Sequence, residues 1–233
     1  MSEASGPKHP IKGASVLLAG ASGGLGQAFA AELQERGALL TMVARDQSRL
    51  DAVPAEGARL AVDLRTPDGC AAAVAAAKEH GGGLNIVINA VGVVAFGTVA
   101  ELSVDVMEEL FLTNTFVPIM LAGAALPLLD KGDAIVNISG VIAEKGLPGM
   151  AAYGASKAAV RSFDEALQRE ARREGVRVLD ARPGHTETGL VSRALAGEAP
   201  DFAEGLQPKQ VAVRICDALE AGTKDLPSEE FGD

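Results

Sequence analysis

A regular alternation of short β-branched runs and longer Ala- and Leu-rich stretches constrains the fold of this chain more than any other feature. Each short run is typical of a buried strand, and each longer stretch has the apolar periodicity of a helix. A repeated strand-helix-strand pattern with right-handed crossovers predicts a doubly wound parallel sheet, an α/β fold with helices on both faces. The expected strands are residues 15–18, 39–43, 59–62, 85–88, 134–138 and 177–181, and the expected helices are 24–36, 68–80, 103–129, 151–174 and 208–221.

Length and composition fit one domain. The chain has 233 residues, and these are 48% hydrophobic but only 3% aromatic. The core is therefore expected to be built from aliphatic side chains, which suits a parallel sheet covered by helices. Residues 1–12 are polar and contain proline, so we expect a flexible N-terminal arm followed by a single domain over residues 13–233.

Charge and cysteine usage exclude several classes of partner. The formal net charge of −10 repels nucleic-acid phosphates and anionic lipid head groups, so neither nucleic acid nor membrane is an expected partner. Cys70 and Cys216 lack metal-ligand spacing and the density of a disulfide scaffold, which predicts buried, reduced thiols and no metal site. The N-terminus has no apolar segment and no later run offers about 20 uninterrupted apolar residues, so a cytoplasmic location is expected.

A glycine-rich turn follows the first expected strand. The sequence Ala19-Gly20-Ala21-Ser22-Gly23-Gly24-Leu25-Gly26 leads directly into the first helix. In an open parallel sheet ligands bind at the carboxyl ends of the strands, and such a turn lets backbone N–H groups approach a pyrophosphate. The same glycines would also suit a tight bend without a ligand, but this turn opens the strand-helix series. It therefore predicts a dinucleotide site.

A phenol and an ammonium group are expected on one face of the helix over residues 151–174. Tyr153 and Lys157 are four residues apart, hence one helical turn apart, and Tyr153 is the only tyrosine in the chain. A nearby cation stabilises phenolate, so Lys157 is expected to lower the pKa of Tyr153 from about 10 towards neutrality, as proton transfer requires. In isolation such a pair would indicate an exposed helix face, but here it follows a strand end.

These motifs together resemble the short-chain dehydrogenase/reductase family over nearly the whole chain. The spacing Gly-x-x-x-Gly-x-Gly and the sequence Tyr153-Gly154-Ala155-Ser156-Lys157 carry the resemblance. It implies a Rossmann-type fold and an NAD(P)-dependent oxidoreductase that transfers a hydride between the nicotinamide and a carbonyl or alcohol substrate. By the same resemblance Tyr153 would protonate the carbonyl oxygen, and Lys157 would hold the nicotinamide ribose. Asn114 matches the asparagine that supports a water relay to the lysine.

The resemblance also marks the residues expected to bind the cofactor. The loop that begins Pro183-Gly184 matches the family's Pro-Gly-x-x-x-Thr, whose threonine, here Thr188, bonds the nicotinamide carboxamide. Asp63 matches an adenine-contacting aspartate, although an ordinary helix cap is the alternative. Asn89 is better explained as a strand-bridging residue than as a ligand. The full expected set is Gly20, Ser22, Gly24, Leu25, Gly26, Arg45, Asp63, Leu64, Asn89, Gly92, Tyr153, Lys157, Pro183, Gly184, Thr186 and Thr188.

Arg45 decides the expected cofactor. It directly follows the second strand, where an acidic side chain would bind the ribose hydroxyls of NAD and an arginine would pair with the 2′-phosphate of NADP. The alternative is a solvated Arg45 next to Asp46 as a helix N-cap. We expect NADP(H) to be favoured over NAD(H).

Three positions depart from the family's pattern. Ala19 stands where a threonine is usual, and Ala90 replaces an asparagine. The catalytic serine normally lies thirteen residues before the tyrosine, and that position is Gly140 here, with Ser139 one residue earlier. Either the strand end bends so that Ser139 enters the site as a catalytic residue, or a backbone N–H group or water serves the oxyanion position.

Mostly apolar residues are expected to line the substrate pocket, which favours a small, largely apolar ketone or alcohol. Glu144 is a candidate for recognising a polar group, and His185 is better explained as a solvated or packing residue than as a second acid or base. The alternative function is a non-catalytic NAD(P)-binding sensor or scaffold with a decayed active site. Family members pair through the helices that hold Asn114 and Tyr153, so a homodimer or homotetramer is expected. The expected lining is Val93, Val94, Phe96, Val141, Leu147, Met150 and residues 188–206.

Overall fold

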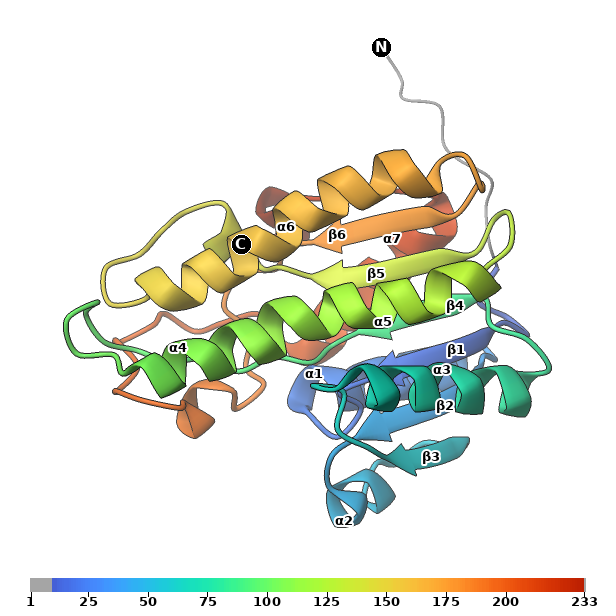
Figure 1. Cartoon of the computed structure of the whole chain (residues 1–233), viewed down its shortest axis with the longest axis horizontal. Helices are drawn as coiled ribbons and strands as arrows, with labels where there is room; N and C mark the ends of the chain where they lie inside the picture. The colour runs from blue at the N-terminus through green and yellow to red at the C-terminus, as the bar shows by residue number, and fades with distance from the viewer. Residues whose placement is uncertain (1–9, 233) are drawn as a thin grey trace.

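A seven-stranded parallel sheet runs through residues 10–232, the part of the chain that the computed structural model describes (Figure 1). Its strands are β1 (Ser15–Ala19), β2 (Leu39–Ala44), β3 (Ala58–Ala61), β4 (Ile86–Asn89), β5 (Ala134–Ile138), β6 (Arg177–Ala181) and β7 (Asp225–Leu226). The strand order is β3-β2-β1-β4-β5-β6-β7, so the order reverses between β1 and β4. In open α/β sheets this reversal forms the crevice in which ligands bind.

Helices cover both faces of the sheet, as the alternating pattern predicts. They are α1 (Gly24–Glu35), α2 (Gln47–Asp51), α3 (Pro67–Gly81), α4 (Val104–Phe111), α5 (Val117–Ala125), α6 (Ala151–Ala171) and α7 (Pro208–Ala221). Helices α1 and α7 pack against each other on one face, and α3, α5 and α6 pack on the other. The predicted fold class, a Rossmann-type doubly wound α/β sheet, is confirmed.

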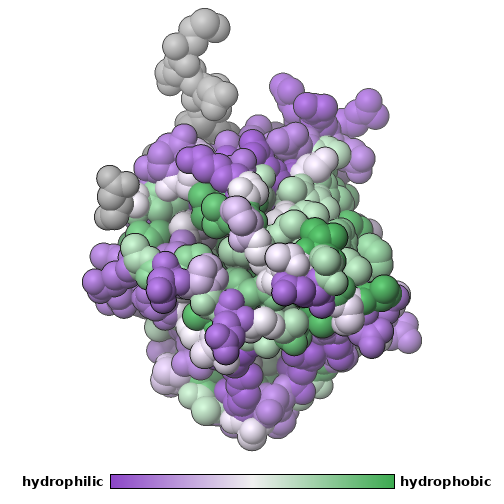
Figure 2. All heavy atoms as spheres, turned by 90° about the vertical axis from the view of Figure 1, so that its left-hand side faces the viewer, coloured by the Kyte–Doolittle hydropathy of each residue, from purple (hydrophilic) through white to green (hydrophobic). Residues whose placement is uncertain are grey.

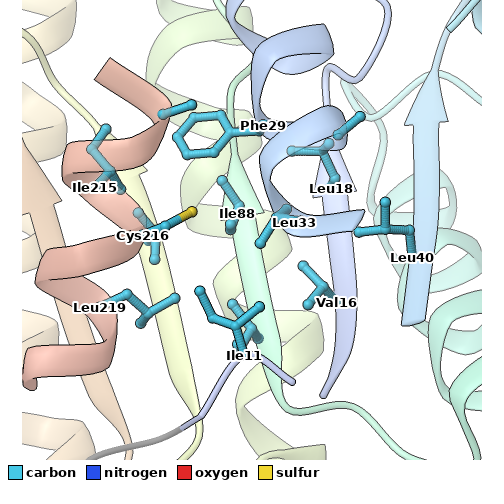
Figure 3. Close-up of a cluster of buried hydrophobic side chains, with 14 of the residues drawn as sticks. Ile11, Val16, Leu18, Phe29, Leu33, Leu40, Ile88, Ile215, Cys216 and Leu219 are labelled. Atoms are coloured by element: carbon cyan, nitrogen blue, oxygen red, sulfur yellow. The ribbon is translucent and has the colours of Figure 1, made fainter. Parts of the chain in front are cut away.

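The core on the α1 and α7 side is aliphatic, as the composition predicts. Figure 3 shows Phe29 and Leu33 of α1 facing Ile215 of α7 above Val16 and Ile88 of the sheet. Each fully buried side chain of this size contributes about 1.5–3 kcal/mol to stability. The two cysteines are buried free thiols, one in each layer, and burial raises the pKa of Cys216 to about 12 and that of Cys70 to about 11.

The folded part of the chain begins earlier than predicted. Ile11, which was expected in the flexible arm, is fully buried beneath Leu219 and Val16 (Figure 3). Its backbone N–H donates to Glu220 Oε1 at 3.2 Å, so the segment is tied to α7. The sequence signal for this burial was the apolar side chain of Ile11 within an otherwise polar segment. The rest of the predicted arm, residues 1–9, lies outside the described residues.

Three local elements differ from the predicted ones. The expected long helix over residues 103–129 is interrupted by a π-helical turn, Leu112–Phe116, between α4 and α5. Helix α2 is too short for periodicity to reveal it, since it spans only five residues. Strand β7 lies in the acidic tail that carried no pattern, and it pairs in parallel with β6 through Asp180↔Asp225 and Ala181↔Leu226.

One continuous helical stretch, Val104–Leu128, is long and apolar enough to cross a membrane by length and composition alone. Half of its most apolar window is buried inside the protein, where α5 packs against α3 and α6. Charged residues lie only in its first turns, and Thr113, Asn114 and Thr115 interrupt its apolar part, so it is not a run of about 20 uninterrupted apolar residues.

The carboxyl ends of the strands define one edge of the molecule. All strand arrows in Figure 1 point to this edge, and the loops that follow β1, β4, β5 and β6 meet there. Figure 2 looks directly onto the edge and shows apolar side chains gathered over its centre and right-hand side, with hydrophilic ones mainly above, to the left and below. The sheet therefore brings together residues that are far apart in the sequence.

Candidate active site

A continuous groove crosses the carboxyl edge of the sheet in two parts. The first part, called here the tyrosine cavity, has a volume of about 230 Å³ and contains Tyr153, Lys157 and the loop after β6. The second part, the arginine cavity, has a volume of about 390 Å³ and lies beyond the ends of β2 and β3. Both are bounded by the loops after β1 and β4. Residues common to the two walls are Gly23, Ala90, Val91, Gly92, Leu190 and Arg193.

The glycine turn after β1 is shaped for close approach of backbone. A Cβ atom at Gly26 would lie 2.1 Å from the Gly20 carbonyl oxygen, and one at Gly20, whose φ is +80°, would lie 2.8 Å from the Ala90 carbonyl carbon. No side chain caps the N-terminus of α1, which leaves the N–H groups of its first turn available to a ligand. The turn therefore fits the pyrophosphate of a dinucleotide, and the replacement of threonine by Ala19 leaves this cradle intact.

Two arginines line the arginine cavity without a close carboxylate partner. Arg45 is about half exposed, and its nearest carboxylate, Glu109, is 3.9 Å away. Arg49 donates to the Ser22 carbonyl at 3.2 Å. Asp46 is the N-cap of α2, because its carboxylate accepts from the Arg49 N–H, so the predicted alternative for Asp46 is correct.

The acidic residue at the end of β3 is held by its neighbour. Asp63 accepts from the Arg65 guanidinium at 2.7 Å, and this contact lowers the pKa of Asp63. Arg65 also forms a hydrogen bond to Glu109 at 2.9 Å. Asp63 and Leu64 both line the arginine cavity, where the adenine end of a dinucleotide would lie.

Tyr153 and Lys157 lie on the first turns of α6 and both line the tyrosine cavity. The Lys157 ammonium donates to the Ile138 carbonyl at 2.8 Å. Burial lowers the pKa of Lys157 to about 8, and the negative charges of Asp180 and Asp164 behind it oppose that shift. The predicted pair on one helix face is therefore present in the cavity.

The expected direction of the Tyr153 pKa shift is wrong for the protein without cofactor. Burial of the phenol raises the pKa of Tyr153 to about 12, and Lys157 contributes no opposing stabilisation. The physical reason is the position of the lysine, whose ammonium is directed to the end of β5. A spacing of four residues predicts a shared helix face, but it does not fix where a long side chain points.

Asn114 lies in the π-helical turn between α4 and α5, and such turns are frequent at functional sites. Its Nδ2 donates to the Val93 carbonyl and to Ser156 Oγ, and its Oδ1 accepts from the Val93 N–H at 2.9 Å. A Cβ atom at Gly92 would lie 3.6 Å from Asn114 Oδ1 and 3.7 Å from Lys157 Nζ. Asn114 thus fixes the loop after β4 beside the lysine.

Ser139 lines the tyrosine cavity, but its hydroxyl is hydrogen-bonded to Asp180. Its side chain is fully buried, and Oγ donates to Asp180 Oδ1 at 2.5 Å. A serine hydroxyl has one proton to donate, so Ser139 cannot also donate to an oxyanion. The N–H groups of Gly140 and Val141 donate to the carbonyls of Ala181 and Pro183. Of the predicted alternatives, neither the shifted serine nor these two N–H groups is free to serve the oxyanion position.

Gly140 occupies a conformation that favours glycine. Its φ is +77° and its ψ is 163°, which a serine at this position would not adopt without strain. A Cβ atom there would meet only the Pro183 carbonyl oxygen, at 3.8 Å. The backbone angle, rather than lack of space, therefore separates this strand end from the family's pattern.

The structure also places the remaining predicted cofactor-binding residues. Asn89 donates to Asn137 Oδ1 and accepts from the Val91 N–H, so it bridges strands, as its alternative assignment expects. The loop after β6 brings four predicted residues to the tyrosine cavity: Pro183, Gly184, Thr186 and Thr188. On the other side of the turn, Gly24 and Leu25 line the same cavity, and Ser22 lines the arginine cavity.

The wall of the tyrosine cavity is mainly apolar, as predicted, although Val93 lies in the arginine cavity instead. His185 stacks on Phe202 with ring centroids 4.7 Å apart, which is a packing role. Glu144 accepts from Ser228 Oγ and pairs with Arg182, so it is not free to recognise a substrate. The apolar wall includes Val94, Phe96, Val141, Ile142, Leu147, Met150, Leu190, Val191 and Phe202.

Sequence reasoning missed three arginines of the groove, namely Arg49, Arg65 and Arg193. Arg49 is one turn beyond Arg45, in a helix too short to show a pattern. Arg193 lies in the segment expected to line the substrate pocket, yet it also lines the arginine cavity. Neither the basic character nor the spacing of these residues distinguishes them from solvated surface arginines.

Comparison with known proteins decides the family. A model of the short chain dehydrogenase family matches residues 14–199. This chain belongs to the short-chain dehydrogenase/reductase family. A zebrafish (Danio rerio) relative, dehydrogenase/reductase SDR family member 7B, is 32% identical over 93% of this chain and 77% of its own length. The ketoacyl reductase HetN of a Nostoc strain is 31% identical over 93% of this chain and 78% of its own length.

Solved structures share the fold. A short-chain dehydrogenase from Burkholderia cenocepacia in complex with NADP superimposes with a TM-score of 0.82 at 24% identity, covering 95% of this chain and 98% of its own. A short-chain dehydrogenase/reductase from Burkholderia phymatum in complex with NAD gives a TM-score of 0.85 at 23% identity, with 94% and 90% covered. This short-chain dehydrogenase/reductase is an NAD(P)-dependent oxidoreductase, and the glycine cradle and the two-part groove fit such a cofactor.

Proposed function

We propose that this protein is an NADPH-dependent carbonyl reductase acting on a largely apolar ketone or aldehyde. The observation that carries the proposal is the groove itself, which joins a cavity lined by four arginines at one end to an apolar cavity with Tyr153 at the other. A bound nicotinamide would supply the hydride for the carbonyl carbon. The residues of this chain then bind the cofactor, exclude water and deliver the proton.

The preference for NADPH rests on the charges of the arginine cavity. Asp46 caps α2 and Asp63 is bound by Arg65, so both carboxylates already have partners within the protein. Arg45 and Arg49 keep their positive charge facing the cavity, and a guanidinium pairs well with a phosphate. The 2′-phosphate is the group that distinguishes NADPH from NADH, so these arginines favour NADPH.

Tyr153 is the proposed proton donor. In the reduction, hydride adds to the carbonyl carbon while the Tyr153 O–H bond breaks and its proton moves to the carbonyl oxygen, giving the alcohol. In the protein without cofactor, burial raises the pKa of Tyr153 to about 12 and keeps the phenol protonated at neutral pH. Efficient proton transfer requires that this pKa fall towards neutrality in the complex with cofactor and substrate. Lys157 and Asn114, which flank the loop at Gly92, position the nicotinamide side of the groove.

The substrate class follows from the walls of the tyrosine cavity. Phe96, Met150 and Phe202 present apolar surface, while Glu144, the acidic group expected near the pocket, is paired with Arg182 and Ser228. Transfer of apolar substrate surface from water contributes about 25 cal/mol per Å². Longer apolar chains are therefore expected to bind more tightly than short polar ones, up to the capacity of about 230 Å³.

A homodimer is part of the proposal. Val104, Phe116 and Ile119 on α4, the π-helical turn and α5 are 62%, 52% and 37% exposed, which leaves an apolar strip on the outer face of these helices. Large apolar side chains exposed together indicate an interface. Sedimentation analysis showing only monomers at micromolar concentration would contradict it. The proposed location is the cytoplasm, which cell fractionation tests.

The cofactor assignment is tested by titrating NADPH and NADH, using the fluorescence of the reduced nicotinamide. We expect NADPH to bind about tenfold more tightly, the lower end of a charge-assisted contact because Arg45 is about half exposed. Arg45→Ala should remove most of that difference, whereas Arg173→Ala, an exposed arginine outside both cavities, should leave it unchanged. Equal affinities in the wild type, or an unchanged ratio in Arg45→Ala, would refute the assignment.

A further inference from the structure

The segment that follows Thr188 crosses the groove and is anchored on its opposite wall. This segment, residues 188–206, is called here the strap. The Leu195 N–H donates to the Val94 carbonyl and the Phe96 N–H donates to the Ala196 carbonyl, both at 2.8 Å. Gly197, with φ at +68°, lies so close to Phe96 that a Cβ atom would be 2.1 Å from its carbonyl oxygen. The middle of the strap is therefore fixed to the loop after β4.

The start of the strap packs against the glycine turn. A Cβ atom at Gly24 would lie 2.5 Å from the Thr188 carbonyl oxygen, so the strap and the N-terminus of α1 are in close contact. The same carbonyl accepts from Arg193 Nη2 at 3.4 Å. The Arg193 guanidinium thus lies next to Thr188, and Arg193 lines both the tyrosine cavity and the arginine cavity.

The positive charge of Arg193 has no carboxylate partner among the described residues. Arg193 is the only charged residue among those common to the walls of both cavities. Within residues 10–232 it forms no ion pair with a carboxylate, and a long hydrogen bond to a carbonyl does not neutralise a guanidinium. Arg65, by contrast, is fully engaged with Asp63 and Glu109. The centre of the groove therefore attracts an anionic group.

We propose that Arg193 binds the diphosphate of the dinucleotide from the strap side, opposite the free N–H groups at the N-terminus of α1. The diphosphate is the anionic group that lies between the adenosine and the nicotinamide, as Arg193 lies between the two cavities. The assignment rests on the proposed function only in taking a dinucleotide as the occupant of the groove. It makes Arg193 a cofactor-binding residue that also holds the strap closed over the bound cofactor.

NADPH and NADH both contain the diphosphate, so the assignment predicts the same loss of affinity for each. Arg193→Gln should weaken NADPH and NADH by the same factor, roughly tenfold for one exposed charge-assisted contact. ADP-ribose, which carries the diphosphate without the nicotinamide, should lose the same factor. Arg173→Gln removes the same charge from an exposed site outside the groove and should bind all three ligands as the wild type does.

Proteolysis provides a readout that is independent of turnover. Trypsin cleaves after arginine, and Arg193 is exposed on the strap. Saturating NADPH or NADH should slow cleavage between Arg193 and Ala194 in the wild type by about tenfold or more. Gly197→Ala, which separates the strap from Phe96, should speed this cleavage and weaken both dinucleotides.

Two results would overturn the assignment. Arg193→Gln binding both dinucleotides with wild-type affinity would show that the guanidinium does not contact the cofactor. Loss confined to NADPH would show that it contacts the 2′-phosphate instead. A wild-type protein that binds neither dinucleotide would contradict the proposed function itself, and this assignment with it.

Discussion

Replacing Ser139 by alanine separates a structural serine from a catalytic one. The Ser139 hydroxyl donates to Asp180 Oδ1 at 2.5 Å, and both side chains are buried. A hydrogen bond to a charged acceptor contributes about 1.5–3 kcal/mol. The substitution removes the donor to Asp180 Oδ1, while Oδ2 of the same carboxylate keeps its contact with Arg182 Nη1 at 2.6 Å. We therefore expect Ser139→Ala to lower the free energy of unfolding by about 2 kcal/mol.

That loss converts to a measurable change in thermal stability. For a chain of this length 1 kcal/mol shifts the Tm by roughly 2–4 °C, so Ser139→Ala should melt about 4–8 °C lower by circular dichroism. Ser162→Ala, an exposed serine on α6, should change the Tm by less than about 2 °C. The kcat of Ser139→Ala, measured well below its Tm, should stay within about twofold of the wild type.

The opposite pattern would refute this reading of the strand end. Loss of an oxyanion donor lowers kcat by about 10²–10³-fold with little effect on stability. If Ser139→Ala showed that loss and an unchanged Tm, its hydroxyl would have to reach the substrate in the working enzyme. The contact with Asp180 would then describe only the protein without ligands.

Three further predictions address the turn, the tyrosine and the buried acid. Gly26→Ala should weaken NADPH binding by at least about tenfold, because its Cβ would lie 2.1 Å from the Gly20 carbonyl, while Gly123→Ala, with open space around it, should bind normally. Absorbance near 295 nm reports Tyr153 alone, and the cofactor-free protein should titrate with a pKa near 12; a value at or below 10 would contradict burial as the dominant effect. Burial holds the pKa of Asp164 well above its usual range, so its contribution to stability is present below its unfolded pKa of about 4 and is lost as pH rises. The free energy of unfolding from urea titrations should therefore shift in favour of Asp164→Asn, relative to the wild type, between pH 5 and pH 8. The same difference between variant and wild type at both pH values would exclude the effect.

The fold was predictable because hydrophobic periodicity reports burial. Strands β5 and β6 begin and end where their β-branched runs do, at Ala134–Ile138 and Arg177–Ala181. Strand β7 was not predictable, since Asp225 and Leu226 are held by pairing with β6 rather than by any pattern of their own. The π-helical turn at Leu112–Phe116 was equally hidden, because it keeps the apolar character of the helices around it.

The sequence predicted which residues reach the site better than it predicted where their side chains point. The glycine turn, Tyr153 and Lys157 all reach the groove, since strand ends and helix starts fix where their backbones lie. The direction of the Lys157 ammonium and of the Ser139 hydroxyl depends on partners from distant strands, Ile138 and Asp180. Sequence spacing contains no information about such contacts.

The proton donor is the centre of this account, and turnover by Tyr153→Phe tests it most directly. NADPH oxidation at 340 nm is to be followed with a series of apolar ketones and aldehydes of increasing chain length. The wild type should turn over at least one of them, with KM falling as the chain lengthens. Tyr153→Phe should bind NADPH normally and lose about 10²–10⁴-fold in kcat, the contribution of general acid catalysis. Equal turnover by the wild type and Tyr153→Phe would contradict the account.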